Sequence, residues 1–182
     1  MIQRHDTLLV FILSLTPWHP AESRLVRLPN LSFREKCLTL GYMKPETPRI
    51  INLPRIHDPR GNLTVVQNNE HIPFAIRRAY WIYDVPAGSE RGGHSHLDMS
   101  QLLVALSGSL NVNLCDGYSW RTFTLNRPFQ GLFIPPGIWR TLDNFSSGTV
   151  CLSLVSNDYD EADYIYDFDR FKELSRSHEP IF

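Results

Sequence analysis

The sequence GSERGGHSH, residues 88–96, is the most informative stretch of this 182-residue chain. Its two histidines, His94 and His96, are separated by a single residue, and side chains two positions apart in a β-strand point to the same side of a sheet. Gln101 and Gly108 follow this pair further along the chain. The stretch therefore predicts a β-strand that carries two imidazoles on one face.

The spacing of these residues resembles the first motif of the cupin barrels, G-x5-H-x-H-x4-E-x6-G, whose histidines and glutamate bind a metal ion. Gln101 stands at the glutamate position and lacks the charge that helps to hold a divalent cation. The second cupin motif, P-x-G-x2-H-x3-N, matches residues 135–144 except that Arg140 replaces the histidine. Arginine stays protonated and has no lone pair to give to a metal. We therefore expect no tight metal site, because two of four ligands are lost and a cation is gained.

What remains is a pair of groups that titrate near neutrality beside cations. Arg140 and Arg91 can attract an anionic substrate or an oxyanion. Such a site suits abstraction of a proton next to a carbonyl group, followed by return of a proton to the neighbouring carbon. Three other interpretations stay open: the histidines could be metal ligands, they could be ordinary polar residues, and Arg140 could form a structural salt bridge at the mouth of the barrel.

Most of the chain from Arg49 onward is predicted to form short β-strands separated by turns. The pattern predicts strands at residues 63–67, 77–85, 101–106, 110–115, 120–125, 132–134 and 150–155. The last of these is apolar almost throughout and is expected to be buried on both faces. Many short strands with regular turns are typical of an antiparallel sandwich or barrel.

The C-terminal region is the part that is predicted to be helical. Phe168, Phe171 and Leu174 recur at three-residue spacing, which places them on one face of a helix. The acidic run at residues 158–169 is interpreted as a solvated surface segment that caps the end of the barrel. The predicted fold is an all-β cupin, a double-stranded β-helix or jelly-roll barrel, with a short C-terminal helix.

Composition limits the partners and the compartment. The chain has 42% hydrophobic residues, which suits one domain with an ordinary core. The formal net charge is −1, so no general attraction to nucleic acid or to an anionic membrane is expected. The three cysteines, Cys37, Cys115 and Cys151, are too scattered for a disulfide framework and favour a reducing, cytoplasmic location.

The N-terminal region differs from the rest of the sequence. Residues 1–46 are interpreted as a weakly structured extension or a start-site artefact, with Met43 as an alternative start, and residues 47–182 as the cupin domain. The apolar run at Thr7–Leu15 is too short to span a bilayer. A signal-peptide hydrophobic region is the alternative interpretation of this run, although no clear cleavage site follows it.

Four segments carry a resemblance to one family: residues 77–96 (RRAYWIYDVPAGSERGGHSH), 101–112 (QLLVALSGSLNV), 131–147 (GLFIPPGIWRTLDNFSS) and 151–171 (CLSLVSNDYDEADYIYDFDRF). They resemble the dTDP-4-keto-6-deoxyglucose 3,4-ketoisomerases, and the resemblance covers about residues 48–175. It implies a metal-free jelly-roll homodimer, without a cofactor, that acts on a dTDP-linked keto sugar. The ketone would move from C4 to C3 through an enediol intermediate, often in a pathway of surface polysaccharide biosynthesis.

The resemblance also implies roles for individual residues. His94 and His96 match the catalytic histidine pair of the family, and Tyr80 lies on its R-x-Y strand as a further catalytic residue. The residues expected to bind the substrate are Arg78, Arg91, Gln101 and Arg140. Some family members have a histidine at the position of Arg140.

Other parts of the functional prediction are less specific. A thymine ring needs a flat apolar partner, for which the candidates are Trp81, Tyr83, Trp120 and Trp139. Two alternative functions stay open at this point: a non-catalytic nucleotide-sugar-binding module and a metal-dependent cupin enzyme.

Overall fold

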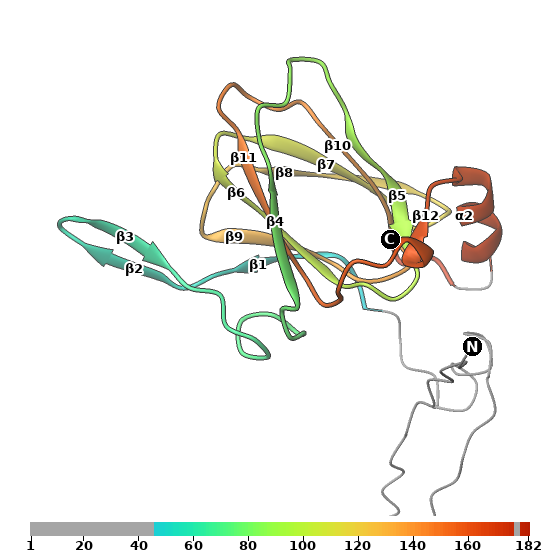
Figure 1. Ribbon diagram of the computed structural model, residues 1–182, viewed down its shortest axis with the longest axis horizontal. Coiled ribbons are helices and arrows are strands. Elements are labelled where there is room, and N and C mark those ends of the chain that lie inside the picture. The colour runs from blue at the N-terminus through green and yellow to red at the C-terminus, as the bar shows by residue number, and fades with distance from the viewer. Residues whose placement is uncertain (1–45, 177–178) are drawn as a thin grey trace, which may run out of the picture. The chain divides into compact units, whose positions relative to one another are not determined.

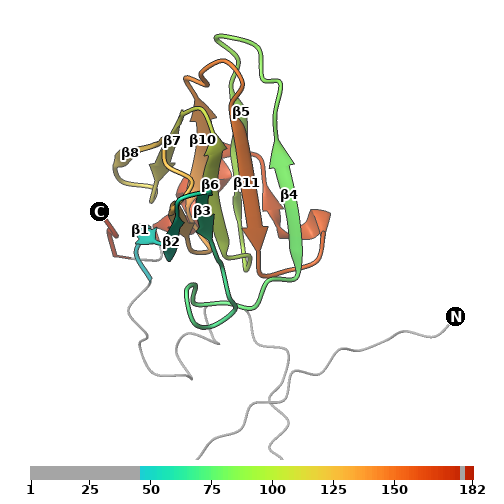
Figure 2. The ribbon, with the colours of Figure 1, turned by 90° about the vertical axis from the view of Figure 1, so that its left-hand side faces the viewer.

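The computed structural model describes residues 46–176 and 179–182, and the predicted extension therefore lies outside the described residues except for Glu46. The described chain forms two five-stranded antiparallel sheets that face each other (Figure 1; Figure 2). The first sheet runs in the order β1 (Arg49–Asn52), β9 (Gln130–Ile134), β6 (Gln101–Ser107), β11 (Val150–Val155) and β4 (Arg78–Ile82). The second runs in the order β12 (Tyr164–Ile165), β5 (Arg91–His96), β10 (Trp139–Asp143), β7 (Leu110–Cys115) and β8 (Trp120–Leu125).

The main core lies between the two sheets and is built by alternation along the strands. In β7, for example, Leu110, Val112 and Leu114 are all buried in this core. The intervening Asn111 and Asn113 instead accept hydrogen bonds from threonine hydroxyls of β8 on the outer face. Each buried aliphatic side chain contributes about 1.5–3 kcal/mol relative to an exposed one.

The outer face of the first sheet carries a second apolar cluster. Leu102 of β6 and Leu154 of β11 pack there against Ile72 and Phe74, which belong to the segment that precedes β4. Cys151 of β11 points the other way, into the main core. The prediction that the run at residues 150–155 is buried on both faces is therefore confirmed.

A two-stranded hairpin, β2 (Arg55–Asp58) and β3 (Gly61–Thr64), extends away from the sheets (Figure 1). The predicted strand at residues 63–67 was wrong in its bounds, because the turn of the hairpin is confined to residues 59 and 60 and the second strand already begins at Gly61. Pro59 fixes the φ angle that such a turn needs, and the Asp58 carboxylate accepts the N–H of Arg60. Cross-strand pairing then brings His57 opposite Asn62.

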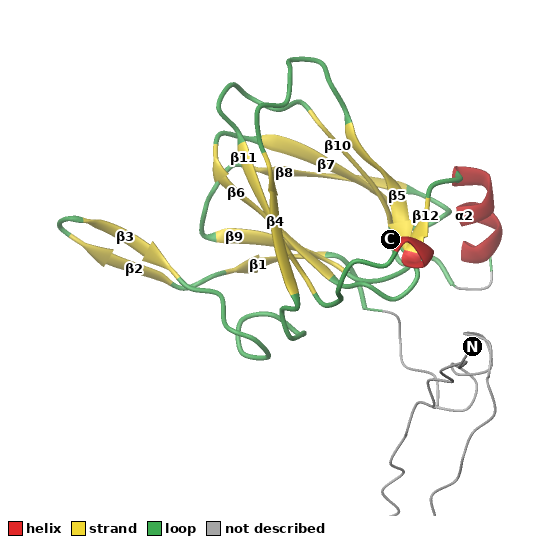
Figure 3. Ribbon diagram, viewed as in Figure 1, coloured by secondary structure: helices red, strands yellow, loops and turns green. Residues whose placement is uncertain are grey.

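The predicted C-terminal helix is present as α2 (Phe168–Ser175), beside β12 (Figure 3). Its start is capped by Asp167, whose carboxylate accepts the N–H of Arg170. Phe171 is buried, but Leu174 is 44% exposed, so the predicted apolar face is buried only in part. Ser175 is buried instead, because at 3.6 residues per turn the fourth residue after Phe171 follows that face more closely than the third.

Within residues 46–176 and 179–182, no helix has the length and apolar character that crossing a membrane requires.

Candidate active site

The pairing of β5 brings together side chains from three strands. Arg140 of β10 lies directly opposite His94, and Tyr164 of β12 lies directly opposite His96. Residues that are directly opposed in an antiparallel pair have their side chains on the same face. The histidine pair and Arg140 therefore share the face that looks toward the first sheet, where Leu114, the other partner of Arg140, is buried in the main core.

A bulge in β5 sets this alignment. The register between β5 and β10 shifts between Arg140 and Thr141, so that Thr141 faces Gly92. Gly92 has φ 84°, and a Cβ atom at this position would lie 2.8 Å from the carbonyl oxygen of Arg140. Only glycine fits this close approach at position 92, and Gly93 has φ 71°, a backbone angle that also favours glycine.

The two imidazole rings contact each other. Their centroids are 4.9 Å apart and the ring planes make an angle of 82°. His96 is fully buried and His94 is partly buried. The ring of Tyr164 lies 4.3 Å from the ring of His96 and 5.2 Å from that of His94. The structure thus places both predicted histidines in one aromatic cluster.

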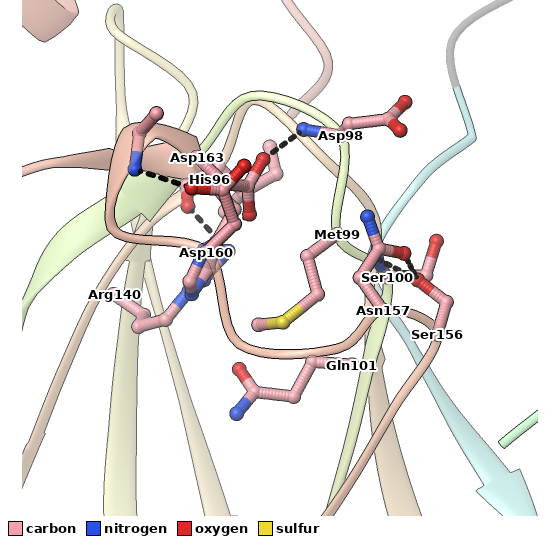
Figure 4. A network of polar contacts seen from close by, with 12 residues as sticks. His96, Asp98, Met99, Ser100, Gln101, Arg140, Ser156, Asn157, Asp160 and Asp163 are labelled. Atoms are coloured by element: carbon pink, nitrogen blue, oxygen red, sulfur yellow. Dashed lines mark hydrogen bonds and ion pairs between the residues drawn. The ribbon is translucent and has the colours of Figure 1, made fainter. Parts of the chain in front are cut away.

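The carboxylate of Asp163 contacts the Nδ1 side of the His96 ring (Figure 4). Its Oδ2 atom lies 2.8 Å from Nδ1 of His96, and its Oδ1 atom accepts the backbone N–H of Asp98 at 2.8 Å. The side chain of Asp163 is only 12% exposed. The prediction that the acidic run at residues 158–169 is a solvated surface segment was therefore wrong for this residue, because the short helix η1 (Glu161–Asp163) turns it inward.

Both histidines are neutral at pH 7. Burial, followed by the charge of Arg140, lowers the pKa of His94 to about 4. The same two causes lower the pKa of His96, with smaller effects of His94 and Arg78. Burial also raises the pKa of Asp163 above its usual range.

The proton on His96 can be assigned from its partners. A neutral imidazole carries one proton, and an Nδ1 atom that faces a carboxylate is the donor. The Nε2 atom then has a free lone pair, and it is buried without a hydrogen-bond partner among the described residues. A buried polar atom that is left unpaired in this way is uncommon and marks a position where a ligand group can bind.

Arg140 is also buried with polar atoms that lack partners among the described residues, but these atoms are hydrogen-bond donors on a cation. Its guanidinium is fully buried, and its Nη2 atom donates to the carbonyl oxygen of Ile138 at 2.8 Å. The Nε and Nη1 atoms are buried and have no partner in the described part of the chain. The ion pairs found among those residues do not include Arg140, so the structural salt bridge considered from the sequence is not formed there. Burial lowers the pKa of Arg140 to about 10, which leaves the group charged.

Gln101 is held on the facing sheet by two contacts. Its Nε2 atom donates to the hydroxyl of Tyr80 at 2.9 Å and to that of Ser153 at 2.7 Å. The Oε1 atom is buried and unpartnered among the described residues, so it can still accept a hydrogen bond. Burial raises the pKa of Tyr80, and Arg140 opposes this shift, which places the phenol within the electrostatic reach of the guanidinium.

The two remaining arginines lie in different environments. The guanidinium of Arg78 stacks over the rings of Tyr80 and Tyr159, with 5.4 Å to each ring centroid. Its Nη2 atom contacts the sulfur of Met99, and its Nε atom is buried and unpartnered within the described chain. Arg91 is exposed at the opposite end of β5 from His96, and the structure gives it no contact with the histidine pair.

The aromatic candidates for stacking on the thymine ring also lie in different environments. Trp81, Tyr83 and Trp120 are exposed. Trp139 is buried against the aromatic side chains of α2, with 5.5 Å between its ring centroid and that of Phe171. Trp139 is therefore part of a core cluster.

The described residues lack a cluster of metal-binding side chains but form a groove on the surface. In residues 46–176 and 179–182, no group of three or more histidine, cysteine or acidic side chains is arranged to hold a metal ion. A groove of about 360 Å³ lies on the outer face of the first sheet, away from the histidines, between the hairpin and a floor that includes Val104, Leu106 and Leu152.

Comparisons with known proteins agree with this architecture. The family model FdtA: WxcM-like, C-terminal matches residues 46–176. TDP-4-oxo-6-deoxy-alpha-D-glucose-3,4-oxoisomerase of Aneurinibacillus thermoaerophilus is 42% identical over 124 residues, which are 68% of this chain and 89% of that protein.

Solved structures give the same result. A 3,4-ketoisomerase from Helicobacter canadensis is 40% identical with a TM-score of 0.69, over 71% of this chain and 97% of that one. A histidine-to-asparagine mutant of the 3,4-ketoisomerase QdtA from Thermoanaerobacterium thermosaccharolyticum, in complex with TDP-4-keto-6-deoxyglucose, is 35% identical with a TM-score of 0.71, over 72% and 95%.

The fold and these relatives define a cupin of the sugar-isomerase class. More narrowly, the chain belongs to the FdtA, WxcM-like C-terminal family, whose similar members are 3,4-ketoisomerases, and the resemblance seen in the sequence is confirmed.

Proposed function

We propose that this chain is a 3,4-ketoisomerase that converts a TDP-linked 4-keto-6-deoxyhexose into the 3-keto sugar by proton transfer through its histidine pair. One observation carries the proposal: the unpartnered Nε2 of His96 and the unpartnered Nε and Nη1 of Arg140 lie in the same buried cluster. A neutral base and a fixed cation are the two groups that enolisation of a ketone requires. The relatives named above act on such sugars.

The chemistry follows from these groups. The C3 proton is weakly acidic because the adjacent C4 carbonyl stabilises the carbanion as an enolate. A neutral imidazole removes this proton while N–H groups of Arg140 donate to the oxygen that becomes negative. Return of a proton to C4, with loss of the proton from the C3 hydroxyl, leaves the ketone at C3. The second imidazole or the phenol of Tyr80 moves the protons on the oxygens.

Metal independence is part of this proposal. The second cupin motif places Arg140 where a metal-binding histidine would stand, and this guanidinium remains charged at neutral pH. A buried positive charge directly opposite His94 repels a divalent cation. We infer that the guanidinium takes over the electrostatic role that a metal ion fills in other cupins.

The remaining predicted contacts complete the substrate site. Arg78 and the more distant Arg91 carry the charge that a diphosphate needs, and the free Oε1 of Gln101 can accept a hydrogen bond from a sugar hydroxyl. An exposed aromatic side chain, such as Trp81, can stack on the thymine ring.

A homodimer is proposed from the unequal outer faces of the two sheets. The second sheet is covered with polar side chains such as Asn113, whose amide donates to the carboxylate of Asp143. The first sheet instead has an apolar groove, and the nearby hairpin exposes the facing pair Ile56 and Leu63. Apolar surface of this kind is typical of a protein interface. Free, buried Cys115 and Cys151 support the proposed cytoplasmic location.

The direct test is incubation with TDP-4-keto-6-deoxyglucose in deuterated water, followed by NMR of the sugar. We expect loss of the C3 proton signal and formation of the 3-keto product, with no stoichiometric transition metal in the purified protein. Binding without exchange at C3 would identify a non-catalytic module. Activity that requires a stoichiometric metal would identify a metal-dependent cupin enzyme.

A further inference from the structure

Asp163 contacts His96, one of the two histidines proposed to transfer protons, and its side chain is only 12% exposed although it belongs to an acidic surface segment. Both of its carboxylate oxygens are engaged, one with Nδ1 of His96 and the other with the N–H of Asp98. Its backbone carbonyl accepts the N–H of Leu97 at 3.0 Å. Three contacts therefore join Asp163 to three consecutive residues of the chain, and they leave the carboxylate little freedom to move.

The surrounding segment strengthens this attachment. Asp160 caps η1 by accepting the N–H of Ala162, which fixes the turn that directs Asp163 inward. Immediately afterwards, Tyr164 pairs with His96 and Ile165 with Ser95 in the β12–β5 ladder. The segment from Asp160 to Ile165 thus holds His96 through both its backbone and its side chain. Figure 4 shows the side-chain contact between Asp163 and His96.

This arrangement selects one form of the imidazole. A carboxylate can only accept, so a neutral His96 must place its proton on Nδ1. Its Nε2 atom is then obliged to present a lone pair, and this is the atom that is buried without a partner. Without the carboxylate, a neutral imidazole can carry its proton on either nitrogen, and the Nε2–H form is no base at the position where the substrate binds.

We propose that Asp163 is a positioning residue that holds His96 in the Nδ1–H form and so directs the Nε2 lone pair at the substrate. This inference rests on the proposed ketoisomerase function. It also makes the segment from Asp160 to Ile165 part of the active site. Asp163 lies 67 positions after His96 in the sequence.

The test combines ¹⁵N NMR of histidine-labelled protein with kinetics of Asp163→Asn. In the wild-type protein, the long-range couplings of His96 are expected to show a protonated Nδ1 and a bare Nε2. An asparagine can turn its NH2 group toward Nδ1, which forces the proton onto Nε2. We expect Asp163→Asn to lower kcat about 10²-fold or more, with KM and the affinity for TDP within about threefold of wild type.

Asp158→Asn is the matched control, because Asp158 belongs to the same acidic run but is exposed and pairs only with Arg77 among the described residues. It is expected to retain wild-type kcat and the Nδ1–H form of His96. A wild-type spectrum with the proton on Nε2 overturns the inference and does not depend on the folding of any variant. Unchanged kcat in Asp163→Asn overturns it as well.

The two proposals fail in different ways. If wild-type protein does not isomerise the sugar but His96 shows the Nδ1–H form, the ketoisomerase function is wrong and the role of Asp163 in the tautomer stands. If wild-type protein isomerises the sugar and His96 carries its proton on Nε2, the function stands and the role of Asp163 is wrong.

Discussion

Arg140 lies directly opposite His94 across the β5–β10 pair, and two of its guanidinium nitrogens are buried without a partner among the described residues. A charge in this environment is costly, because its hydration is lost and no carboxylate among the described residues forms an ion pair with it. The attraction of the Asp163 carboxylate offsets this cost only in part, since burial still lowers the pKa of Arg140. Proteins keep such strained groups at functional sites, where a ligand completes the missing interactions. The guanidinium of Arg140 therefore lowers the stability of the fold while it serves the proposed reaction.

Replacement of Arg140 tests this link. We expect Arg140→Met to lower kcat about 10²–10³-fold, because the donors to the developing oxyanion are lost. The same change should raise the free energy of unfolding by about 1 kcal/mol or more, because a buried charge without an ion-pair partner among the described residues is replaced by an apolar side chain of similar length. Urea unfolding and steady-state kinetics measure the two effects.

Arg77→Met is the control for Arg140→Met, since Arg77 is exposed and pairs with Asp158 at the surface. It should change neither quantity appreciably. If Arg140→Met instead unfolds the domain or retains wild-type turnover, the guanidinium is a structural group and its assigned role is wrong.

The depressed pKa of His94 makes stability depend on pH. The pKa is about 4 in the folded protein and 6.5 in the unfolded chain, so the unfolded chain binds more protons between these values. The contribution is fully present above pH 6.5 and is lost as the pH falls toward 4. The difference corresponds to at most about 3 kcal/mol. The groups around His94 are His96, Arg140, Tyr164 and Tyr166.

Urea unfolding at pH 7.5 and pH 4.5 measures this dependence. We expect the wild-type protein to lose more stability over this interval than His94→Asn, in which the titrating group is absent. His96 contributes in the same direction, because burial also lowers its pKa. An equal loss in both proteins would mean that His94 titrates normally in the folded state.

The proposed dimer predicts a difference between the two outer faces. Ile56→Asp, in the exposed hairpin, should weaken self-association at least about tenfold, because it places a charge in the apolar contact. Thr124→Asp, on the polar outer face of β8, should leave association unchanged. Sedimentation equilibrium of both variants checks the prediction, and a wild-type protein that is monomeric at all concentrations contradicts it.

Local patterns in the sequence predicted the part of the site that depends on local geometry. The placement of His94 and His96 on one face follows from the two-residue period of a strand. Arg140 could be found because it replaces a ligand at a known position in a motif. The apolar run at residues 150–155 likewise predicted a strand buried on both faces, which β11 confirms.

The rest depended on contacts between distant parts of the chain. Asp163 lies 67 residues after His96, and nothing in the acidic composition of its segment distinguishes it from exposed neighbours such as Asp160. The one available signal was that the strand-forming pair Tyr164–Ile165 follows it directly. The pKa values of the histidines also required the three-dimensional structure, because burial is their main cause.

The proposed mechanism requires that two neutral imidazoles move the proton in a cupin site that has lost two of its four metal ligands. The most direct measurement is turnover of TDP-4-keto-6-deoxyglucose by His94→Asn and His96→Asn, each checked for folding and for TDP affinity. We expect folded proteins that bind TDP within about threefold of wild type and lose kcat by about 10³-fold or more. Near wild-type turnover in both variants would contradict the proposed role of the histidines.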